Sequence, residues 1–180
     1  WTQDNPTDEH IIVSTDSDFY QLISDKVSQY NGTTDQIVKI DGIYEAKTMK
    51  RAIDKKTQEP KCVPNPKWLL FEKCVRGDTS DNIFSAFPGA RKKGSKNKTG
   101  MLEAFADMER GGFDYNNFML QRWVDHNDEE HRVIDDFERN KILIDLTQQP
   151  DEIKAGIRNV FAESSNKDKV QNVGIFFMKF

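Results

Sequence analysis

Cysteine is scarce in this 180-residue chain, and long apolar runs are missing. The two cysteines, Cys62 and Cys74, form no CxxC pair, and the N-terminus carries no signal-type apolar segment, so nothing indicates secretion or a disulfide framework. No stretch approaches the roughly 18 consecutive apolar residues that a transmembrane helix needs. We therefore expect a cytoplasmic protein that does not cross a membrane.

Apolar residues are also few, at 36% of the chain, while charged residues make up 31%. Much of the sequence must therefore be solvated surface, loop or ligand-facing acid. An aromatic content of 11% nevertheless argues against wholesale disorder. The length fits one domain with a real core, and we expect one compact unit.

The net charge of −4 by itself argues mildly against nucleic-acid binding, which usually leaves a basic footprint. The distribution of charge is more informative than the sum, because cations and carboxylates occupy separate short segments. Such a separation suits a protein that binds both metal ions and phosphates. The clustered cations are Arg91, Lys92, Lys93, Lys96 and Lys98.

The first part of the chain has the pattern of an α/β protein. Residues 10–15 are a β-branched run, which is typical of a buried parallel strand, and residues 19–24 place apolar side chains at helical spacing. Alternating patterns at 26–30 and 36–41, on either side of Asn31-Gly32, predict two further short strands and a turn.

The rest of the chain is predicted to be mostly helical. Residues 42–66 show no clear pattern and are interpreted as an exposed connection, after which Pro66 introduces a helix that ends near Gly77. The predicted helices cover residues 67–75, 99–108, 115–124, 130–146 and 151–161.

Two acids, Asp16 and Asp18, follow the first predicted strand directly. In open α/β sheets ligands bind beyond the carboxyl ends of strands, so both carboxylates are candidates for a site. The alternative is local: Asp18 caps the helix that begins at Phe19, and Asp16 belongs to the turn.

A second pair of acids, Asp78 and Asp81, lies in the segment GDTSDN. At this spacing the two carboxylates share one face if the segment is helical. The alternative is a glycine that ends a helix, followed by an Asx turn or a helix cap. Together the two segments supply four carboxylates, and a hard cation such as Mg²⁺ prefers oxygen ligands.

The basic segment 90–99 leads into a predicted helix and ends at Thr99. Its cations can neutralise backbone phosphates, and the helix N-terminus offers free N–H groups to a phosphate oxygen. The alternative is a solvated loop without a ligand. Its position, about ten residues after the second acidic segment, favours the phosphate-binding interpretation.

His126, His131 and the acids between them could form a zinc site, but their spacing matches no standard ligand pattern. We interpret this segment as a solvated loop between helices. Four aromatic residues at helical apolar positions are interpreted as core and not as platforms for stacking bases. They are Trp68, Phe118, Trp123 and Phe137.

The segments STDSDFYQL at 14–22 and RGDTSDNI at 76–83 resemble, in order and separation, the paired motifs of the 5′ nuclease superfamily. Within it, the chain is most similar to phage ribonuclease H and flap endonuclease proteins, because residues 84–97 replace a compact glycine-rich turn. The segment DDFERNKILIDL at 135–146 also resembles a helix of the phage proteins.

The resemblance implies an α/β fold: a PIN-like parallel-sheet lobe at residues 1–75, then a helix-three-turn-helix module and C-terminal helices at 76–180. It implies that a shared set of acids is catalytic and binds metal: Asp16, Asp18, Asp78 and Asp81. It assigns DNA binding to Arg91, Lys92, Lys93, Lys96, Lys98 and Thr99. The cofactor is Mg²⁺ or Mn²⁺, with two ions in the full-length parent.

The implied activity is that of a 5′–3′ exonuclease, flap endonuclease or ribonuclease H that removes primers in phage replication, in the host cytoplasm. Its substrates are branched or 5′-ended duplex DNA and RNA/DNA hybrids. The protein is expected to be a monomer, with a single-stranded DNA-binding protein or a clamp as candidate partners. Further metal ligands are expected upstream of Trp1, so that this chain is a fragment and inactive alone.

Two other functions remain open at this stage. One is a PIN-like ribonuclease, which the basic helical module after the acids argues against. The other is a branched-DNA-binding module without catalysis, which the four carboxylates argue against, because a pure phosphate binder gains nothing from them.

Overall fold

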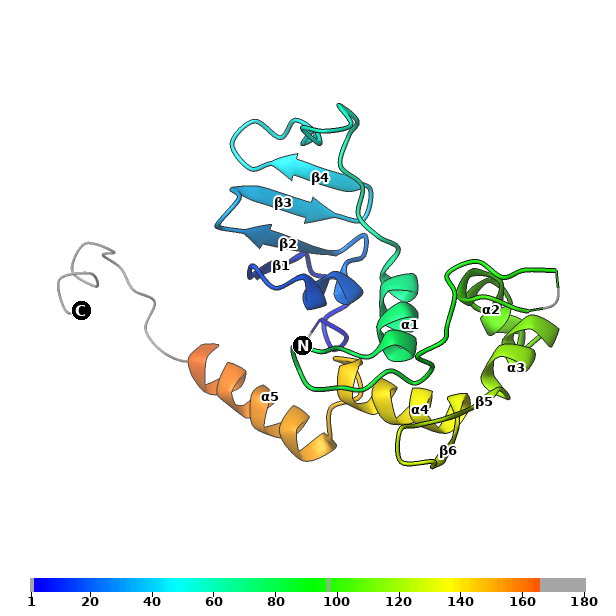
Figure 1. Ribbon diagram of the computed structural model, residues 1–180. Helices are drawn as coiled ribbons and strands as arrows, with labels where there is room; N and C mark the ends of the chain where they lie inside the picture. Colours follow the sequence, from blue (N-terminus) through cyan, green and yellow to red (C-terminus); the bar gives the residue numbers. More distant parts are fainter. Residues whose placement is uncertain (1, 97, 166–180) are drawn as a thin grey trace. The chain divides into compact units, whose positions relative to one another are not determined.

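The computed structural model describes residues 2–96 and 98–165 of the chain (Figure 1). Contacts divide the described residues into two units: Thr2–Gln148 forms one, and the residues from Gln149 to Ser165 belong to the other. The second unit contains α5 (Asp151–Ser165), which confirms the helix predicted from residue 151. No helix among the described residues is long and apolar enough to cross a bilayer.

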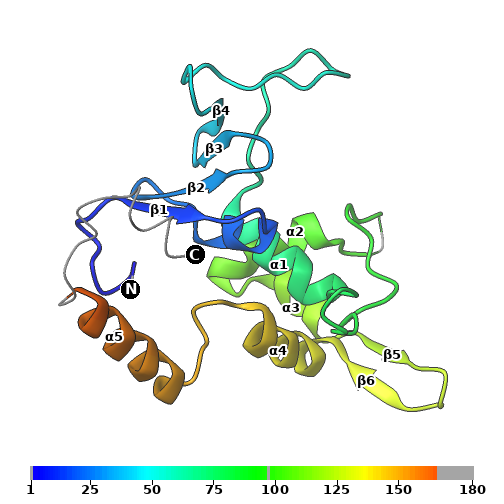
Figure 2. The ribbon, with the colours of Figure 1, turned by 90° about the vertical axis from the view of Figure 1, so that its left-hand side faces the viewer.

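Four strands form the sheet of the first unit, and they follow one another in space as they do in sequence (Figures 1 and 2). They are β1 (His10–Val13), β2 (Val27–Asn31), β3 (Gln36–Lys39) and β4 (Gly42–Glu45). The parallel arrangement expected for the sheet holds for β1 and β2 only, and the later pairs are antiparallel. Short turns join these later strands, and a short turn connects only antiparallel neighbours. The protein is therefore a mixed α/β structure.

Three local predictions for this lobe need correction. Strand β1 forms, but it is an edge strand whose Ile11 and Val13 are 65% and 75% exposed, so it is not buried. The helix predicted at 19–24 is the 3₁₀ helix η1 (Ser17–Leu22), which starts earlier because Asp16 caps it. The connection predicted at 42–66 contains β4, whose order comes from pairing with β3 and not from a local pattern.

Helices and a hairpin complete this unit. They are α1 (Pro66–Arg76), α2 (Met101–Asp107), η2 (Met108–Arg110), α3 (Phe113–Met119), β5 (Arg122–Val124), β6 (Glu130–Arg132) and α4 (Val133–Ile144). The helices predicted at 67–75 and 99–108 are confirmed with shifted ends. Those predicted at 115–124 and 130–146 are too long, because β5 and β6 pair with each other across the segment between them.

The core of this unit lies among α1, α2, α3 and α4 and is rich in aromatic side chains. Phe71 of α1 is its centre, with ring centroids 5.5 to 6.4 Å from three other phenylalanines. The prediction that four aromatic residues belong to the core is confirmed, with the two phenylalanines buried and the two tryptophans packed against them. They are Phe118, Phe137, Trp68 and Trp123.

Hydrogen bonds from two buried or half-buried side-chain amides join α4 to the segments that carry the acids. Asn140 of α4 is fully buried and donates to the carbonyl oxygens of Cys74, at 2.9 Å, and of Phe84, at 2.7 Å. Gln21 of η1 donates to the carbonyl oxygen of Ile144 at 3.2 Å. Side-chain amides that satisfy buried backbone groups fix the relative positions of the segments they join. The two acidic segments are therefore held against one common helix.

Gly77, at the end of α1, is required by the backbone. Its φ of 74° and ψ of −174° lie in a region that only glycine adopts freely, and an added Cβ would sit 2.3 Å from the carbonyl oxygen of Ile83. We expect Gly77→Ala to lower the free energy of unfolding, measured in urea, by about 3 kcal/mol. The matched control is Gly111→Ala, where φ is 56° but nothing lies within 4 Å, so the cost should be only about 1 kcal/mol. Equal losses in the two variants would contradict the steric explanation.

Candidate functional site

The first acidic loop, residues 14–18, is fixed by a buried glutamine. Gln29 of β2 is completely buried, and its Nε2 donates to the carbonyl oxygens of Ser14 and Asp16, both at 2.8 Å. The carboxylate of Asp16 accepts from the N–H of Asp18 at 2.9 Å and so caps η1. Asp18 lies in the first turn of η1, and its side chain is directed at α1.

The second acidic loop, residues 78–83, is a closed backbone turn. Asp78 and Ile83 exchange two backbone hydrogen bonds of 2.8 and 2.9 Å, and Asn82 adopts a positive φ of 58° inside the turn. Oδ1 of Asp78 accepts from the N–H of Ser80 at 3.0 Å and from its hydroxyl at 2.5 Å. The turn thus leaves Oδ2 of Asp78 directed away from its own loop and towards the end of α1.

Lys73, in the last turn of α1, joins the two loops. Its ammonium group donates to Oδ1 of Asp18 and, at 2.8 Å, to Oδ2 of Asp78. One carboxylate oxygen each of Asp18, Asp78 and Asp81 lie within 4.8 Å of one another. These acids come from segments about 60 residues apart, and a positive charge already lies between two of them. The residues present fit a divalent cation, because they form an all-oxygen donor set of the kind that Mg²⁺ prefers.

Electrostatics keep Asp78 and Lys73 charged near neutral pH. The hydrogen bonds from Lys73 and Ser80 lower the pKa of Asp78 to about 2, so its carboxylate is ionised throughout the neutral range. Partial burial lowers the pKa of Lys73, but its hydrogen bonds to Asp18 and Asp78 outweigh that effect and hold the pKa above its ordinary value. A charged lysine therefore offsets the repulsion among the acids until another cation competes for them.

The structure brings together three of the four acids that the sequence singled out. Asp16 is not in the group of three; its carboxylate caps η1, the role that the alternative interpretation had given to Asp18. Two important residues were not foreseen, Lys73 and Gln29. Lys73 lies five residues before Asp78 in the last turn of a predicted helix, a signal that could have been found. Gln29 lies two residues after the apolar Val27 and so on the same face of the strand, which is the one signal that could have indicated its burial.

All five cations of the basic segment are exposed, as a phosphate-binding surface needs. The expectation of free N–H groups at the following helix is corrected, because the N–H groups of Met101 and Leu102 donate to the carbonyl oxygens of Arg91 and Lys92, both at 2.9 Å. The loop thus occupies two of the N–H groups at the start of α2, and they are not free to bind an anion. Lys92 also lies over the ring of Trp68, 5.9 Å from its centroid.

A hollow of about 560 Å³ lies beside the basic segment. Lys96, Lys98 and Thr99 line it, together with the acids Glu103 and Asp114. Thr99 is partly committed within the protein, since its hydroxyl donates to Asp114 at 3.3 Å and accepts from a neighbouring asparagine at 2.9 Å. The two lysines therefore supply the positive charge of this hollow.

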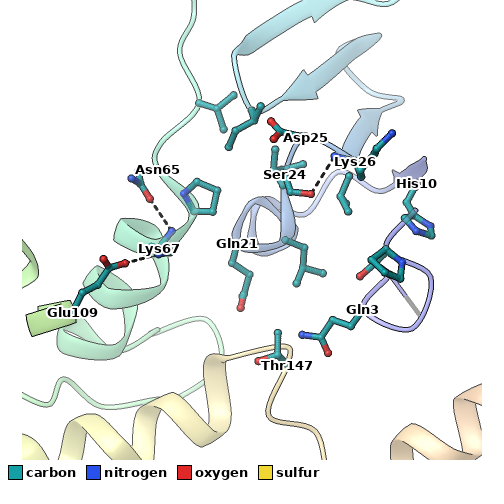
Figure 3. A pocket seen from close by; sticks show the side chains of 18 of the residues that line it. Gln3, His10, Gln21, Ser24, Asp25, Lys26, Asn65, Lys67, Glu109 and Thr147 are labelled. Atoms are coloured by element: carbon teal, nitrogen blue, oxygen red, sulfur yellow. Dashed lines mark hydrogen bonds and ion pairs between the residues drawn. The ribbon is translucent and has the colours of Figure 1, made fainter. Parts of the chain in front are cut away.

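A larger pocket of about 1190 Å³ opens elsewhere on the same unit (Figure 3). Its walls carry charges of both signs, including Asp25, Lys26 and the ion pair between Lys67 and Glu109, whose atoms are 2.5 Å apart. None of the three clustered acids lines this pocket. This pocket and the candidate metal centre are therefore different places.

No family model and no curated protein sequence matches the chain. Among solved structures, the chain is similar to the T5 D15 protein co-crystallized with metal ions, with 20% sequence identity and a TM-score of 0.42. The similarity covers 79% of this chain and 46% of the T5 D15 chain. The chain is also similar to a point mutant of the T5 5′-exonuclease, with 20% sequence identity and a TM-score of 0.41. This similarity covers 77% of this chain and 48% of the exonuclease chain. The chain thus spans slightly less than half the length of either structure.

Proposed function

We propose that the chain belongs to a metal-dependent 5′ nuclease, which hydrolyses phosphodiester bonds at 5′ ends or flaps of DNA or RNA/DNA duplexes. The observation that carries the proposal is the convergence of Asp18 with Asp78 and Asp81, from the two motifs that resemble those of the 5′ nucleases. The two motifs alone are also compatible with two unrelated turns. The convergence of their acids in space is what favours one common site.

In this proposal Asp18, Asp78 and Asp81 hold Mg²⁺ or Mn²⁺, and Asp16 contributes to a two-ion site in the full-length protein. The bound cation supplies Lewis-acid activation of water and of the phosphate. Asp78 is suited to this role because it is ionised at neutral pH. Lys73 bridges Asp18 and Asp78, and beside a bound cation its ammonium group would be placed to neutralise a phosphate oxygen.

Substrate binding is assigned to the exposed cations of the basic segment, which precedes α2, and to Thr99. Contacts of lysine and arginine with phosphates carry no base information, so recognition depends on the structure of the nucleic acid and not on its sequence. The proposal also includes the predicted helix-three-turn-helix module and a role in removing primers during phage replication. It includes a monomeric state and, as partner, a single-stranded DNA-binding protein or a clamp.

The proposal is tested with the full-length protein on a 5′-labelled duplex that carries a 5′ flap. We expect cleavage near the branch in Mg²⁺, none in EDTA, and restored cleavage when Mg²⁺ is added in excess. A duplex with a 3′ flap of the same length and sequence is the matched control and should be cut much more slowly. Binding of both substrates without cleavage would instead support a branched-DNA-binding module, and cleavage of RNA single strands alone would support a PIN-like ribonuclease.

A further inference from the structure

The β5–β6 hairpin places a histidine and two acids side by side, far along the chain from the acidic loops. The sequence suggests a solvated loop between helices, and residues 126–130 are indeed exposed between α3 and α4. His131 differs, because it lies half-buried on β6 and its ring stacks on Trp123 with centroids 4.5 Å apart. One ligand atom each of Asp125, Glu129 and His131 lie within 4.8 Å of one another. The spacing of these residues matched no standard pattern because the turn, and not the sequence interval, brings them together.

The turn itself fixes Asp125 at this position. Oδ1 of Asp125 accepts from the N–H groups of Asn127 and Glu129, both at 2.9 Å, and the turn passes through Asp128 with a φ of 62°. These backbone hydrogen bonds, that of Glu129 foremost, lower the pKa of Asp125. Its carboxylate is therefore ionised near neutral pH, and Oδ2 is the oxygen that faces His131.

His131 has both ring nitrogens next to carboxylates. Nδ1 lies 3.2 Å from Oδ2 of Asp136, a buried residue in the first turn of α4, and Nε2 lies 3.8 Å from Oδ2 of Asp125. Nε2 is inaccessible to solvent and has no hydrogen-bond partner. A buried ring nitrogen without a partner is costly unless something else satisfies it. Oδ2 of Asp136 is likewise buried without a hydrogen-bond partner, although it lies within ion-pair distance of Nδ1.

We propose that Asp125, Glu129 and His131 bind a divalent transition-metal cation of the zinc type. Imidazole together with carboxylates suits such a cation, and Zn²⁺ takes nitrogen and oxygen ligands at about 2.0 to 2.2 Å. In a tetrahedral site those bond lengths put neighbouring donor atoms roughly 3.4 Å apart, so the observed 3.8 Å is close to a binding distance. With three protein ligands, a water molecule completes the coordination.

This site differs in chemistry from the acidic group at Lys73. That group offers only carboxylate oxygens and suits Mg²⁺, whereas a nitrogen ligand shifts preference towards Zn²⁺. The proposed role is structural, because the cation would cross-link the hairpin turn to β6, and Asp136 connects His131 to α4. The inference does not depend on the proposed nuclease activity.

The alternative is that His131 only packs on Trp123 and lies near Asp125 and Asp136, and that the site binds no metal. Titration of the EDTA-treated protein with Zn²⁺ in a calorimeter, in millimolar Mg²⁺ to occupy the acidic group, separates the two. We expect one Zn²⁺ per chain, a change in Trp123 fluorescence and a higher melting temperature. An absence of Zn²⁺ binding under these conditions overturns the proposal.

Four variants locate the site. His131→Ala should lower Zn²⁺ affinity on the order of 100-fold or more, and Glu129→Gln, an exposed change that spares the fold, by at least about tenfold. His126→Ala is the matched control, since His126 is 89% exposed and lies 3.9 Å from the same Asp125 oxygen. Loss of Zn²⁺ in His126→Ala but not in His131→Ala, or in Asp81→Asn but not in Glu129→Gln, overturns the assignment.

Discussion

Replacing Asp18 or Asp81 with Asn in the active nuclease should reduce the rate of flap cleavage in Mg²⁺ by about a thousandfold or more, a barrier increase of roughly 4 kcal/mol. Each amide keeps the size of the side chain but removes one of the negative charges that surround the proposed cation position. The rate is measured in single-turnover assays on a 5′-labelled flap. Affinity for the duplex, measured by fluorescence anisotropy, should stay the same.

Asp81→Asn is the cleaner of the two variants, because Asp81 is exposed whereas Asp18 is also ion-paired with Lys73. Asp25→Asn is the matched control: it removes the same charge from an exposed acid that lines the large pocket instead (Figure 3). The control should cleave like the wild type. Undiminished cleavage by both Asp18→Asn and Asp81→Asn would contradict the assignment of these acids as metal ligands.

The double variant Lys92→Ala, Lys93→Ala should weaken duplex binding strongly and leave the chemistry intact. If each lysine neutralises one phosphate, the slope of log K against log salt should become shallower by about 1.8, and affinity at 0.1 M salt should fall roughly tenfold per contact. The loss should be uniform across duplex sequences, because phosphate contacts carry no base information. Anisotropy titrations at several salt concentrations measure both quantities.

The matched control for that variant is Lys55→Ala, Lys56→Ala, which removes two adjacent exposed lysines from the connection after β4. It changes the net charge by the same amount at a place to which no phosphate contact is assigned. An equal change of salt slope in the two double variants would mean that only the total charge matters, and the basic segment would lose its assigned role.

Where the sequence predicted the structure well, the determinants were local. Pro66 at the first position of α1 and Gly77 beyond its end fixed that helix from residue types alone, and the structure adds the cap by Asn65. The hairpin of β2 and β3 followed in the same way from alternation around a turn. Both elements form where the sequence placed them.

Where prediction failed, partners distant in sequence decided the outcome. β4 is ordered by pairing with β3, and β5 and β6 by pairing with each other, although part of that segment has helical periodicity. β1 lies at the edge of the sheet with Ile11 and Val13 exposed, which its apolar sequence does not reveal. Tertiary pairing overrides a weak local preference in each of these cases.

The candidate site likewise has features that follow from local sequence and features that depend on tertiary packing. Its acids could be singled out because they cluster after predicted elements, whereas their convergence on Lys73 depends on how η1 and α1 pack. The capping role of Asp16 was assigned to the wrong one of two neighbouring acids, since the helix is 3₁₀ and begins at Ser17. Residue types predicted the kind of site, and the packing of the two loops selected its members.

The measurement that tests the central claim most directly is a Mg²⁺ titration of flap cleavage by the wild type and by Asp81→Asn. If Asp81 helps to hold the cation, the wild type reaches a plateau at low Mg²⁺, and the variant needs far more Mg²⁺ or never reaches that plateau. Superimposable titration curves for the two proteins would contradict the claim, because the cation required for cleavage would then lie elsewhere.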